Sequence, residues 1–321
     1  MNYQPVTKVY INLDALKNNI NFVRKKFPNS KIIVPVKANA YGHDATIISK
    51  ACEKLRVDYL AIARLKEGLK LISNGIKLPI LSLGVESYDD NITLAISNEI
   101  ELSISDISNL LTIDSIAKQN NQIAKIHLKV DTGMTRLGCN IDEILEIAKI
   151  IKSSQNLKFV SFYSHLARSE EDRIFTQSQI DKFLEIKDKM EKLNLEPEFY
   201  HLYNSGAIID QYETNLDLAI RPGIMVYGYS PYANGDKNLI PVMTLATNVI
   251  AIRNVKKGVG VSYNHKYITT RPTFLATIPL GYGDGIRRDL SNKLIVTING
   301  KNYPQRGTIT MDLMMIEVDE D

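Results

Sequence analysis

The strongest constraint on the fold is an alternation of short apolar segments with amphipathic helical patterns over about 190 residues. Eight segments are predicted to be strands: Ile32–Val36, Tyr59–Ala63, Pro79–Leu83, Ile100–Ile104, Ala124–Val130, Phe159–His165, Tyr200–Tyr203 and Leu218–Arg221. Helical patterns lie between them, for example at Leu65–Ser73, Ile107–Ala117, Ile141–Ser153 and Gln177–Leu193. Strands separated by helices pair in parallel through crossovers, so eight such units predict a (β/α)8 barrel.

The predicted barrel is flanked by a short N-terminal segment and a C-terminal β region. Residues 8–11 alternate like a strand, and Asn12 precedes a helical pattern whose apolar stripe is Leu13, Leu16, Ile20, Phe22 and Val23. The breaker-rich segment 230–238 predicts a domain boundary, and the pattern beyond it is all-β, with a hairpin turn at Asn299-Gly300. We predict a barrel domain at 1–230, whose first strand (8–11) is available to pair with the second domain, and a β domain at 239–321.

Charge and cysteine content exclude several classes of protein. The 39 basic and 36 acidic residues give a net charge of +3 without long blocks, so we expect neither nucleic acid nor a membrane as a partner. No run reaches the roughly 18 apolar residues of a membrane span, and the N-terminus lacks a signal pattern, which predicts a cytoplasmic protein. Cys52 and Cys139 have no metal-ligand or redox spacing, so reduced thiols and no metal site are expected.

Chemically useful residues follow the carboxyl ends of the predicted barrel strands, where sites of this fold gather. Lys37 follows the first strand, and burial there would lower its pKa and make the amine nucleophilic, although a lysine at that point is often just the first solvated residue. His165, after the sixth strand, is equally compatible with a hydrogen-bonded core histidine. Arg221, after the eighth, is compatible with a structural ion pair.

The last two barrel loops resemble a phosphate site. Asn204-Ser205 follows the seventh strand and Gly223-Ile224 follows the eighth, where this barrel usually binds phosphate, although Asn204-Ser205 can also simply cap a short helix. With an amine at Lys37 and a cation at Arg221, the set favours a phosphorylated aldehyde cofactor held as a Schiff base.

Taken together, these residues make the chain resemble the alanine racemase family, whose members use pyridoxal 5′-phosphate. The resemblance runs from about Lys8 to Asp312. Its motifs are Val36-Lys37-Ala38-Asn39-Ala40-Tyr41-Gly42-His43, Lys129-Val130-Asp131-Thr132-Gly133-Met134, Arg136-Leu137-Gly138, Arg221-Pro222-Gly223-Ile224 and Gly281-Tyr282-Gly283-Asp284-Gly285.

The resemblance implies a two-base interconversion of L- and D-alanine, which supplies D-alanine for peptidoglycan. Lys37 would hold the cofactor and act on one face of the substrate, and Tyr263, donated by the partner subunit of a homodimer with shared sites, would act on the other. The family also implies roles for the remaining site residues. The phosphate would be held by Tyr41, Asn204, Ser205, Gly223 and Ile224, and Arg221 would contact the pyridine nitrogen. His165 would link Tyr263 to Arg221. Arg136 would bind the substrate carboxylate, Lys129 (carbamylated in some members) would steady Arg136, and Met311 and Asp312 would line the mouth of the site.

The chain departs from the family pattern at Asp44, where glycine is common, at Thr310, where cysteine is common, and at the bulkier Tyr203. Family members continue past Asp321 with further strands and a late tyrosine at the phosphate, so the β domain looks incomplete. We expect weakened cofactor retention and reduced or absent activity. Three alternatives stay open: a racemase of another small amino acid such as serine, a non-catalytic pyridoxal-phosphate carrier, against which Tyr263 argues, and a barrel without a cofactor.

Overall fold

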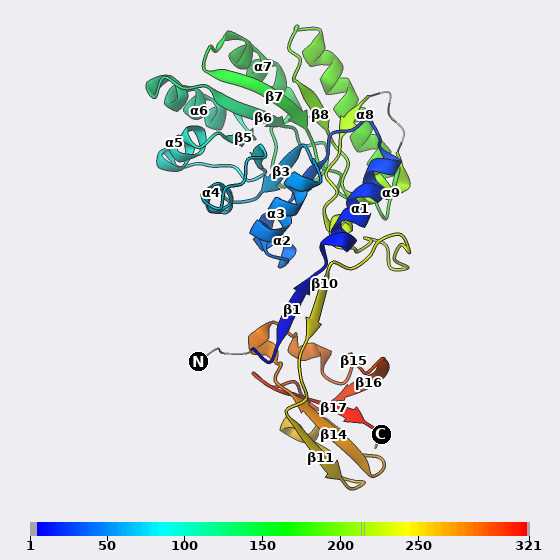
Figure 1. Ribbon diagram of the computed structural model, residues 1–321. Coiled ribbons are helices and arrows are strands. Elements are labelled where there is room, and N and C mark those ends of the chain that lie inside the picture. Colours follow the sequence, from blue (N-terminus) through cyan, green and yellow to red (C-terminus); the bar gives the residue numbers. More distant parts are fainter. Residues whose placement is uncertain (1–4, 213, 215, 320–321) are drawn as a thin grey trace. The chain divides into compact units, whose positions relative to one another are not determined.

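The structure is a computed structural model that describes residues 5–212, 214 and 216–319. The chain forms two compact units, one comprising Asn12–Val242 and the other comprising the described residues up to Ile11 and from Met243 onward. Figure 1 shows the elements of both. The first unit extends past the breaker-rich segment 230–238. The Asn19 side chain exchanges hydrogen bonds with the backbone of Ile240, at 2.8 Å and 2.9 Å, and so ties the residues after this segment to the first helix.

The first unit is a parallel barrel, so the predicted fold class is confirmed. Its sheet runs in the order β2 (Ile33–Pro35), β3 (Tyr59–Ile62), β4 (Ile80–Ser82), β5 (Ile100–Ile104), β6 (Ala124–Lys129), β7 (Leu157–Tyr163), β8 (Phe199–His201) and β9 (Leu218–Ala219). A parallel bridge between Ile32 and Ile220 joins the last strand to the first and closes the ring. Because β2, β8 and β9 are short, the residues next to them carry the loops at the open end of the barrel, where the carboxyl ends of the strands meet.

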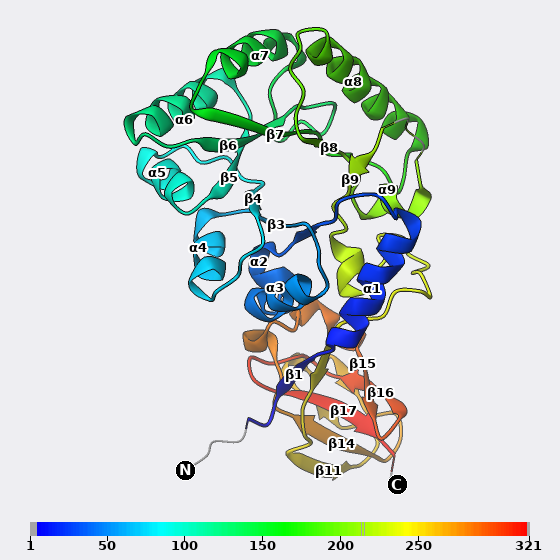
Figure 2. The same cartoon turned by 45° about the horizontal axis from the view of Figure 1, so that its top comes forward.

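Helices surround the sheet, as Figure 2 shows. They are α1 (Leu13–Lys26), α2 (Lys37–Tyr41), α3 (Ala45–Lys54), α4 (Leu65–Ser73), α5 (Asp89–Ser97), α6 (Ile107–Gln119), α7 (Ile144–Ser153), α8 (Arg173–Glu191) and α9 (Ser205–Asp210), with short 3-10 turns η1 (Ile141–Glu143) and η2 (Ile224–Tyr227). Asn12 caps α1 by accepting from the Ala15 amide at 3.0 Å. Leu13, predicted in the apolar stripe, is instead 44% exposed. Helix α8 begins before the predicted Gln177 because Asp172 caps it through the Phe175 amide at 2.9 Å.

The barrel interior contains several polar side chains. Glu101 and Ser103 on β5, His127 on β6, and Ser161 on β7 are all buried, as is His201 on β8. Layers of branched aliphatic residues usually fill this position in the fold. A polar interior requires that its donors and acceptors satisfy one another.

The second unit is all-β apart from short turns. β1 (Lys8–Ile11) pairs antiparallel with β10 (Met243–Ala246), and β12 (Gly260–Val261) pairs with β13 (Tyr267–Ile268). A five-stranded sheet has the order β11 (Ala251–Val255), β14 (Thr273–Ile278), β17 (Met314–Val318), β16 (Lys301–Arg306), β15 (Ile295–Ile298). The 3-10 turns are η3 (Tyr263–His265), η4 (Tyr282–Asp284) and η5 (Arg288–Leu290).

The hairpin predicted at Asn299-Gly300 joins β15 to β16, and both turn residues have positive φ, at 49° and 80°. The apolar core of this unit includes Ile278, Met314 and Ile316. Among the described residues, no helix is long and apolar enough to cross a membrane.

Candidate active site

A cavity of about 490 Å³ lies where the carboxyl ends of the barrel strands meet. Its lining comprises Pro35, Lys37, Tyr41, Ala63, Leu83, Gly84, Lys129, Arg136, Leu137, Tyr163, His165, Glu170, Asn204, Ser205, Gly206, Arg221, Gly223, Ile224 and Pro231. Every candidate site residue that the sequence assigned to the barrel lies in this lining. The cavity is therefore built by the loops that follow the strands.

The segment directly after β2, labelled α2, is a left-handed turn and not a regular right-handed helix. Residues Ala38 to Tyr41 have φ values of 50°, 55°, 55° and 53°, although none of them is glycine. Each such residue costs about 1–2 kcal/mol, so the surroundings must hold the turn in place. One oxygen of Glu67 accepts the Ala38 amide at 2.7 Å, and the other accepts the Ala63 and Arg64 amides at 2.9 Å and 3.0 Å. The turn fixes the directions in which Lys37 and Tyr41 enter the cavity.

Lys37 is half-buried at the start of this turn. Burial lowers the pKa of its amine, and the positive charges of Arg136 and Arg221 lower it further, while the carboxylate of Glu67 opposes them. A lowered pKa raises the fraction of neutral, nucleophilic amine at neutral pH. The position of Lys37 thus suits covalent attachment to an aldehyde.

A group of neutral donors converges on one side of the cavity. A Cβ atom added at Gly223 would lie 3.3 Å from the Tyr41 hydroxyl oxygen and 3.7 Å from the Ser205 hydroxyl oxygen. Within the described chain, the amides of Gly223 and Ile224 form no hydrogen bond. Backbone amides and hydroxyls that face one small space are the donors a phosphate monoester needs, so these residues fit a phosphorylated cofactor.

Asn204, also assigned to this group, has a local structural role. Its side-chain oxygen caps α9 by accepting from the Ala207 amide at 3.1 Å, and its nitrogen donates to the Leu166 carbonyl at 3.1 Å. Asn204 therefore both caps a helix, as one interpretation of Asn204-Ser205 expected, and lines the cavity. Glu170 lies beside it, 2.7 Å from the Ser169 hydroxyl, and brings an exposed carboxylate to the cavity rim.

Arg221 lies at the bottom of the cavity with only 4% of its surface exposed. Its Nη2 donates to the carbonyls of Ser164 and Leu202 at 2.7 Å and 3.0 Å and to Nδ1 of His165 at 3.2 Å, and its Nη1 donates to Nδ1 of His201. Burial lowers the pKa of Arg221 to about 10, so it stays cationic at neutral pH. Burial, followed by the charge of Arg221, holds the pKa of both histidines well below the usual range.

Lys129 and Arg136 approach the cavity from the end of β6 and the loop that follows it. Lys129 is 5% exposed, and burial together with the charge of Arg136 lowers its pKa to about 8. The loop backbone is held by Asp131, whose carboxylate accepts the Gly133 and Met134 amides at 2.8 Å and 2.9 Å. Arg136 itself is exposed. The pair supplies a cation and a partly neutral amine to the same side of the cavity.

The remaining candidates, Tyr263, Met311 and Asp312, belong to the second unit and lie there on neighbouring loops. The Thr308 hydroxyl donates to the Tyr263 carbonyl at 2.8 Å, and the Gly283 amide donates to the Met311 carbonyl at 2.9 Å. The Tyr263 side chain is 66% exposed and that of Met311 is 54% exposed. The second unit thus presents a phenol and a thioether at its surface.

Sequence reasoning missed several residues that shape the cavity. Glu67 lies at the third position of α4, a place typical of a capping carboxylate, and nothing in its motif pointed to the turn that it holds. Tyr163 ends β7 with its ring stacked on His201, 4.3 Å between centroids, and was interpreted only as part of a strand. Tyr203, one of the departures from the family pattern, is absent from the lining and packs against Phe27, with centroids 6.0 Å apart.

Comparison with known families supports one assignment over nearly the whole chain. Residues 11–231 match the family model for the alanine racemase N-terminal domain, and residues 242–321 match the model for the alanine racemase C-terminal domain. Alanine racemase of Treponema denticola is 38% identical over 319 residues, covering 97% of this chain and 83% of that protein. Alanine racemase of Methanococcus maripaludis is 36% identical, covering 96% of this chain and 83% of that protein.

Solved structures give the same result. Alanine racemase from Clostridium difficile aligns with a TM-score of 0.91 at 34% identity, covering 100% of this chain and 84% of that one. Alanine racemase from the D-cycloserine producer Streptomyces lavendulae aligns with a TM-score of 0.93 at 31% identity, covering 100% and 85%. The Bacillus anthracis enzyme, solved with bound L-Ala-P, aligns with a TM-score of 0.89 at 31% identity, covering 100% and 84%.

Proposed function

The chain belongs to the alanine racemase family, and from this premise we propose that it interconverts L- and D-alanine with pyridoxal 5′-phosphate held in the barrel cavity. The single observation that carries the proposal is the convergence of Lys37, Arg221 and the donors around Gly223 on one cavity. When bound, the cofactor would acidify the Cα hydrogen of the amino acid by delocalising the electron pair left behind.

The residues of the cavity divide into those that bind and those that move protons. Tyr41, Asn204, Ser205 and the amides of Gly223-Ile224 would hold the phosphate with neutral donors. Lys37 would hold the cofactor aldehyde. Its amine would then exchange a proton with Cα on one face of the substrate, a task that its lowered pKa favours.

Inversion at Cα requires a second proton donor and acceptor on the opposite face. Tyr263 carries a suitable hydroxyl, and we assign it this role by its match to the family motif. A free phenol has a pKa near about 10, so it needs hydrogen-bonded help to act as a base at neutral pH. His165 is held neutral beside Arg221 and has a ring nitrogen left for such a bond.

Arg221 would face the pyridine nitrogen. A guanidinium that remains cationic would donate to this nitrogen and keep it unprotonated, which would favour return of the proton to Cα over other outcomes. Arg136 would bind the substrate carboxylate, and Lys129 would position Arg136. A pKa of about 8 leaves part of the Lys129 amine neutral at pH 7, which suits carbamylation.

We further propose that the active unit is a cytoplasmic homodimer, with Tyr263, Met311 and Asp312 completing the partner's cavity, and that its D-alanine supplies peptidoglycan. The exposed side chains of Tyr263 and Met311 support such sharing, because each is available at the surface of its own unit.

The test combines trapping with turnover. The chain is incubated with pyridoxal 5′-phosphate, reduced with borohydride, digested and analysed by mass spectrometry, and the pyridoxyl adduct is expected on Lys37. L-alanine and L-serine are then assayed for racemisation. Tyr263→Phe serves as the matched variant and should retain the adduct but lose turnover in at least one direction. An adduct on another lysine, or faster turnover of serine, would overturn the proposal.

A further inference from the structure

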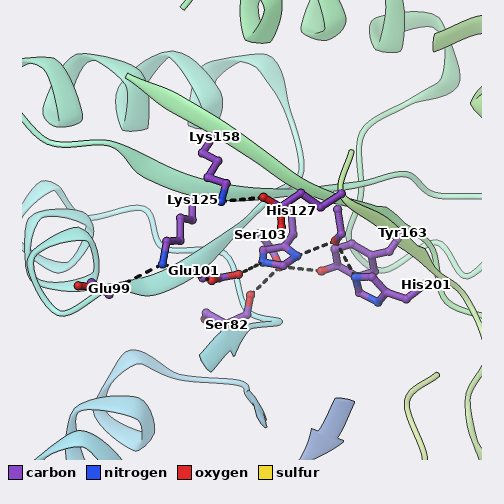
Figure 3. A network of polar contacts seen from close by, with 11 residues as sticks. Ser82, Glu99, Glu101, Ser103, Lys125, His127, Lys158, Tyr163 and His201 are labelled. Carbon is purple, nitrogen blue, oxygen red and sulfur yellow. Dashed lines mark hydrogen bonds and ion pairs between the residues drawn. The ribbon is translucent and has the colours of Figure 1, made fainter. Parts of the chain in front are cut away.

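A chain of buried side chains crosses the barrel interior from Arg221 to an acidic residue on β5. Nδ1 of His201 accepts from Arg221, and its Nε2 lies 2.8 Å from the Ser161 hydroxyl oxygen. The same hydroxyl lies 2.6 Å from Nδ1 of His127, whose Nε2 lies 2.7 Å from a Glu101 carboxylate oxygen. Figure 3 shows Glu101, His127 and His201 along this line, with Tyr163 beside His201. The four side chains that follow Arg221 in this hydrogen-bond chain are all 3% exposed or less.

All donors in this hydrogen-bond chain point in the same direction, from Arg221 toward Glu101. Because a guanidinium can only donate, Nδ1 of His201 must accept, and its proton is on Nε2, which donates to Ser161. The Ser161 hydroxyl has no other partner in the described chain, so it donates to Nδ1 of His127. The proton of His127 is then on Nε2 and is donated to Glu101. The sequence of bonds runs from the cation to the carboxylate with every member satisfied.

Arg221 has no carboxylate partner among the described residues, and its nearest acceptors are two carbonyls and two neutral imidazoles. Glu101 is the only acidic side chain buried in the described part of the barrel unit. It is partly balanced by Lys125, 3.8 Å away. Burial raises the pKa of Tyr59, and the charge of Glu101 raises it further. A buried cation without a local counter-charge is costly, so a carboxylate linked to it through polarised hydrogen bonds is significant.

We propose that Glu101 is a remote positioning residue for Arg221, acting through His127, Ser161 and His201 to hold the guanidinium in place as a charged donor at the cavity floor. Its catalytic consequence rests on the proposed function. The negative charge draws the shared protons toward β5, and this makes Nδ1 of His201 a stronger acceptor for Arg221. Tyr163 keeps the His201 ring in plane by stacking on it, 9° from parallel.

The first test is made on the unmodified chain, without cofactor. The chain has five histidines, so selective ¹⁵N labelling of the imidazole nitrogens gives a spectrum simple enough to assign. Protonated and unprotonated ring nitrogens resonate far apart. His127 and His201 are both expected to be neutral with the proton on Nε2. A proton on Nδ1 of either ring, or a cationic ring, would overturn the proposal.

The second test uses coupling between variants. Glu101→Gln keeps the shape of the side chain but removes its charge, and it is expected to shift the ring signals of His201, two hydrogen bonds beyond its contact. The same substitution made in a Ser161→Ala background should leave His201 unmoved. Ser49→Ala is the control, because Ser49 is a buried hydroxyl on α3 that forms no hydrogen bond within the described residues, and it should leave the His201 signals in place. A His201 shift that persists without Ser161, or is absent with it, contradicts the proposal.

Two further measurements cover a variant that fails to fold and a failure of the proposed function. If Glu101→Gln does not fold by circular dichroism, Ser161→Ala alone decides, because it should shift the signals of both rings, and unchanged rings would overturn the chain. In the cofactor-loaded protein, Glu101→Gln should lower kcat about 2- to 30-fold with little change in KM. The spectra need neither cofactor nor turnover, so they test the hydrogen-bond chain even if the proposed function fails.

Discussion

At the scale of single residues, the amines of Lys37 and Lys129 share one electrostatic environment. Burial is the first cause of the lowered pKa of both, and the charge of Arg136 is the second. Replacing Arg136 by methionine removes that charge, and the pKa of Lys129 should rise from about 8 toward its ordinary value. The pH at which Lys129 is half-modified by acetic anhydride, followed by mass spectrometry, should therefore move upward.

The control for this prediction is Arg168→Met, which removes an exposed arginine that is paired with Asp172, the N-cap of α8, at 3.1 Å and is not among the causes of the Lys129 shift. It should leave the midpoint in place. An Arg136→Met profile that overlays the parent profile would show that burial alone sets the reactivity of Lys129.

Asp44 shows how a departure from a family pattern can be compensated locally. It has φ of 67°, yet its carboxylate caps α3 by accepting the Ile47 amide at 2.9 Å. Asp44→Ala loses the cap and keeps the strained backbone, so it should reduce the free energy of unfolding by about 1–2 kcal/mol. Asp44→Gly loses the cap but relieves the backbone, and should remain within about 0.5 kcal/mol of the parent. Urea unfolding of the two variants tests the order, and equal losses would refute it.

At the scale of elements, the left-handed turn after β2 depends on the side chain of Glu67, which lies on helix α4. Glu67→Gln offers one acceptor oxygen in place of two and turns a donor toward the amides of Ala63 and Arg64. We expect a loss of about 1–3 kcal/mol in unfolding free energy, because the part-buried amide of Ala63 is left unpaired and the left-handed turn loses its anchor. Thermal melts measure it, with Glu99→Gln, an exposed partner of Lys125, as the neutral comparison. A melting temperature equal to that of Glu99→Gln would mean that the turn is stable without the carboxylate of Glu67.

Element positions were predictable where a periodic pattern and a cap agree. Leu65–Ser73 was predicted with the bounds that α4 has, and the barrel followed from the alternation of patterns. The start of α8 was missed because Asp172 had not been identified as its cap. The hydrogen-bond chain from Glu101 to Arg221 was also missed, because its successive members are twenty or more residues apart in sequence. The available signal was polar residues inside strands that had been interpreted as buried.

The candidate residues of the barrel were predictable because this fold always places strand-end loops at one end. The support of those residues was not, since Glu67 and Tyr163 act through contacts that no local motif encodes. The roles of Tyr263, Met311 and Asp312 remain predictions from the family resemblance.

At the scale of the whole molecule, shared sites in a homodimer make a prediction about mixtures. Lys37→Ala and Tyr263→Phe should each be inactive as homodimers. If each cavity takes Tyr263 from the partner, a mixed dimer contains one intact site, and random reassociation in equal amounts should restore about a quarter of parental activity. The measurement is racemisation after the two variants are unfolded and refolded together.

The matching control mixes Lys37→Ala with the double variant Lys37→Ala/Tyr263→Phe, in which no dimer has an intact site. Activity that stays at the level of this control would argue that Tyr263 serves its own subunit, or that the subunits do not exchange.

The closure of the barrel has a consequence for heat inactivation. The ring is sealed by the two-residue strand β9 and a few amide contacts, among them Ile33 to the Ile220 carbonyl and Ile220 to the Lys31 carbonyl, both at 2.9 Å. Lys37 and Arg221 stand on opposite edges of this seam. If the seam opens before the rest of the barrel unfolds, Lys37 and Arg221 separate while most of the fold remains intact. Turnover should then fade at a lower temperature than ellipticity, and the amides of Ile33 and Ile220 should exchange with deuterium ahead of those in β5 and β6.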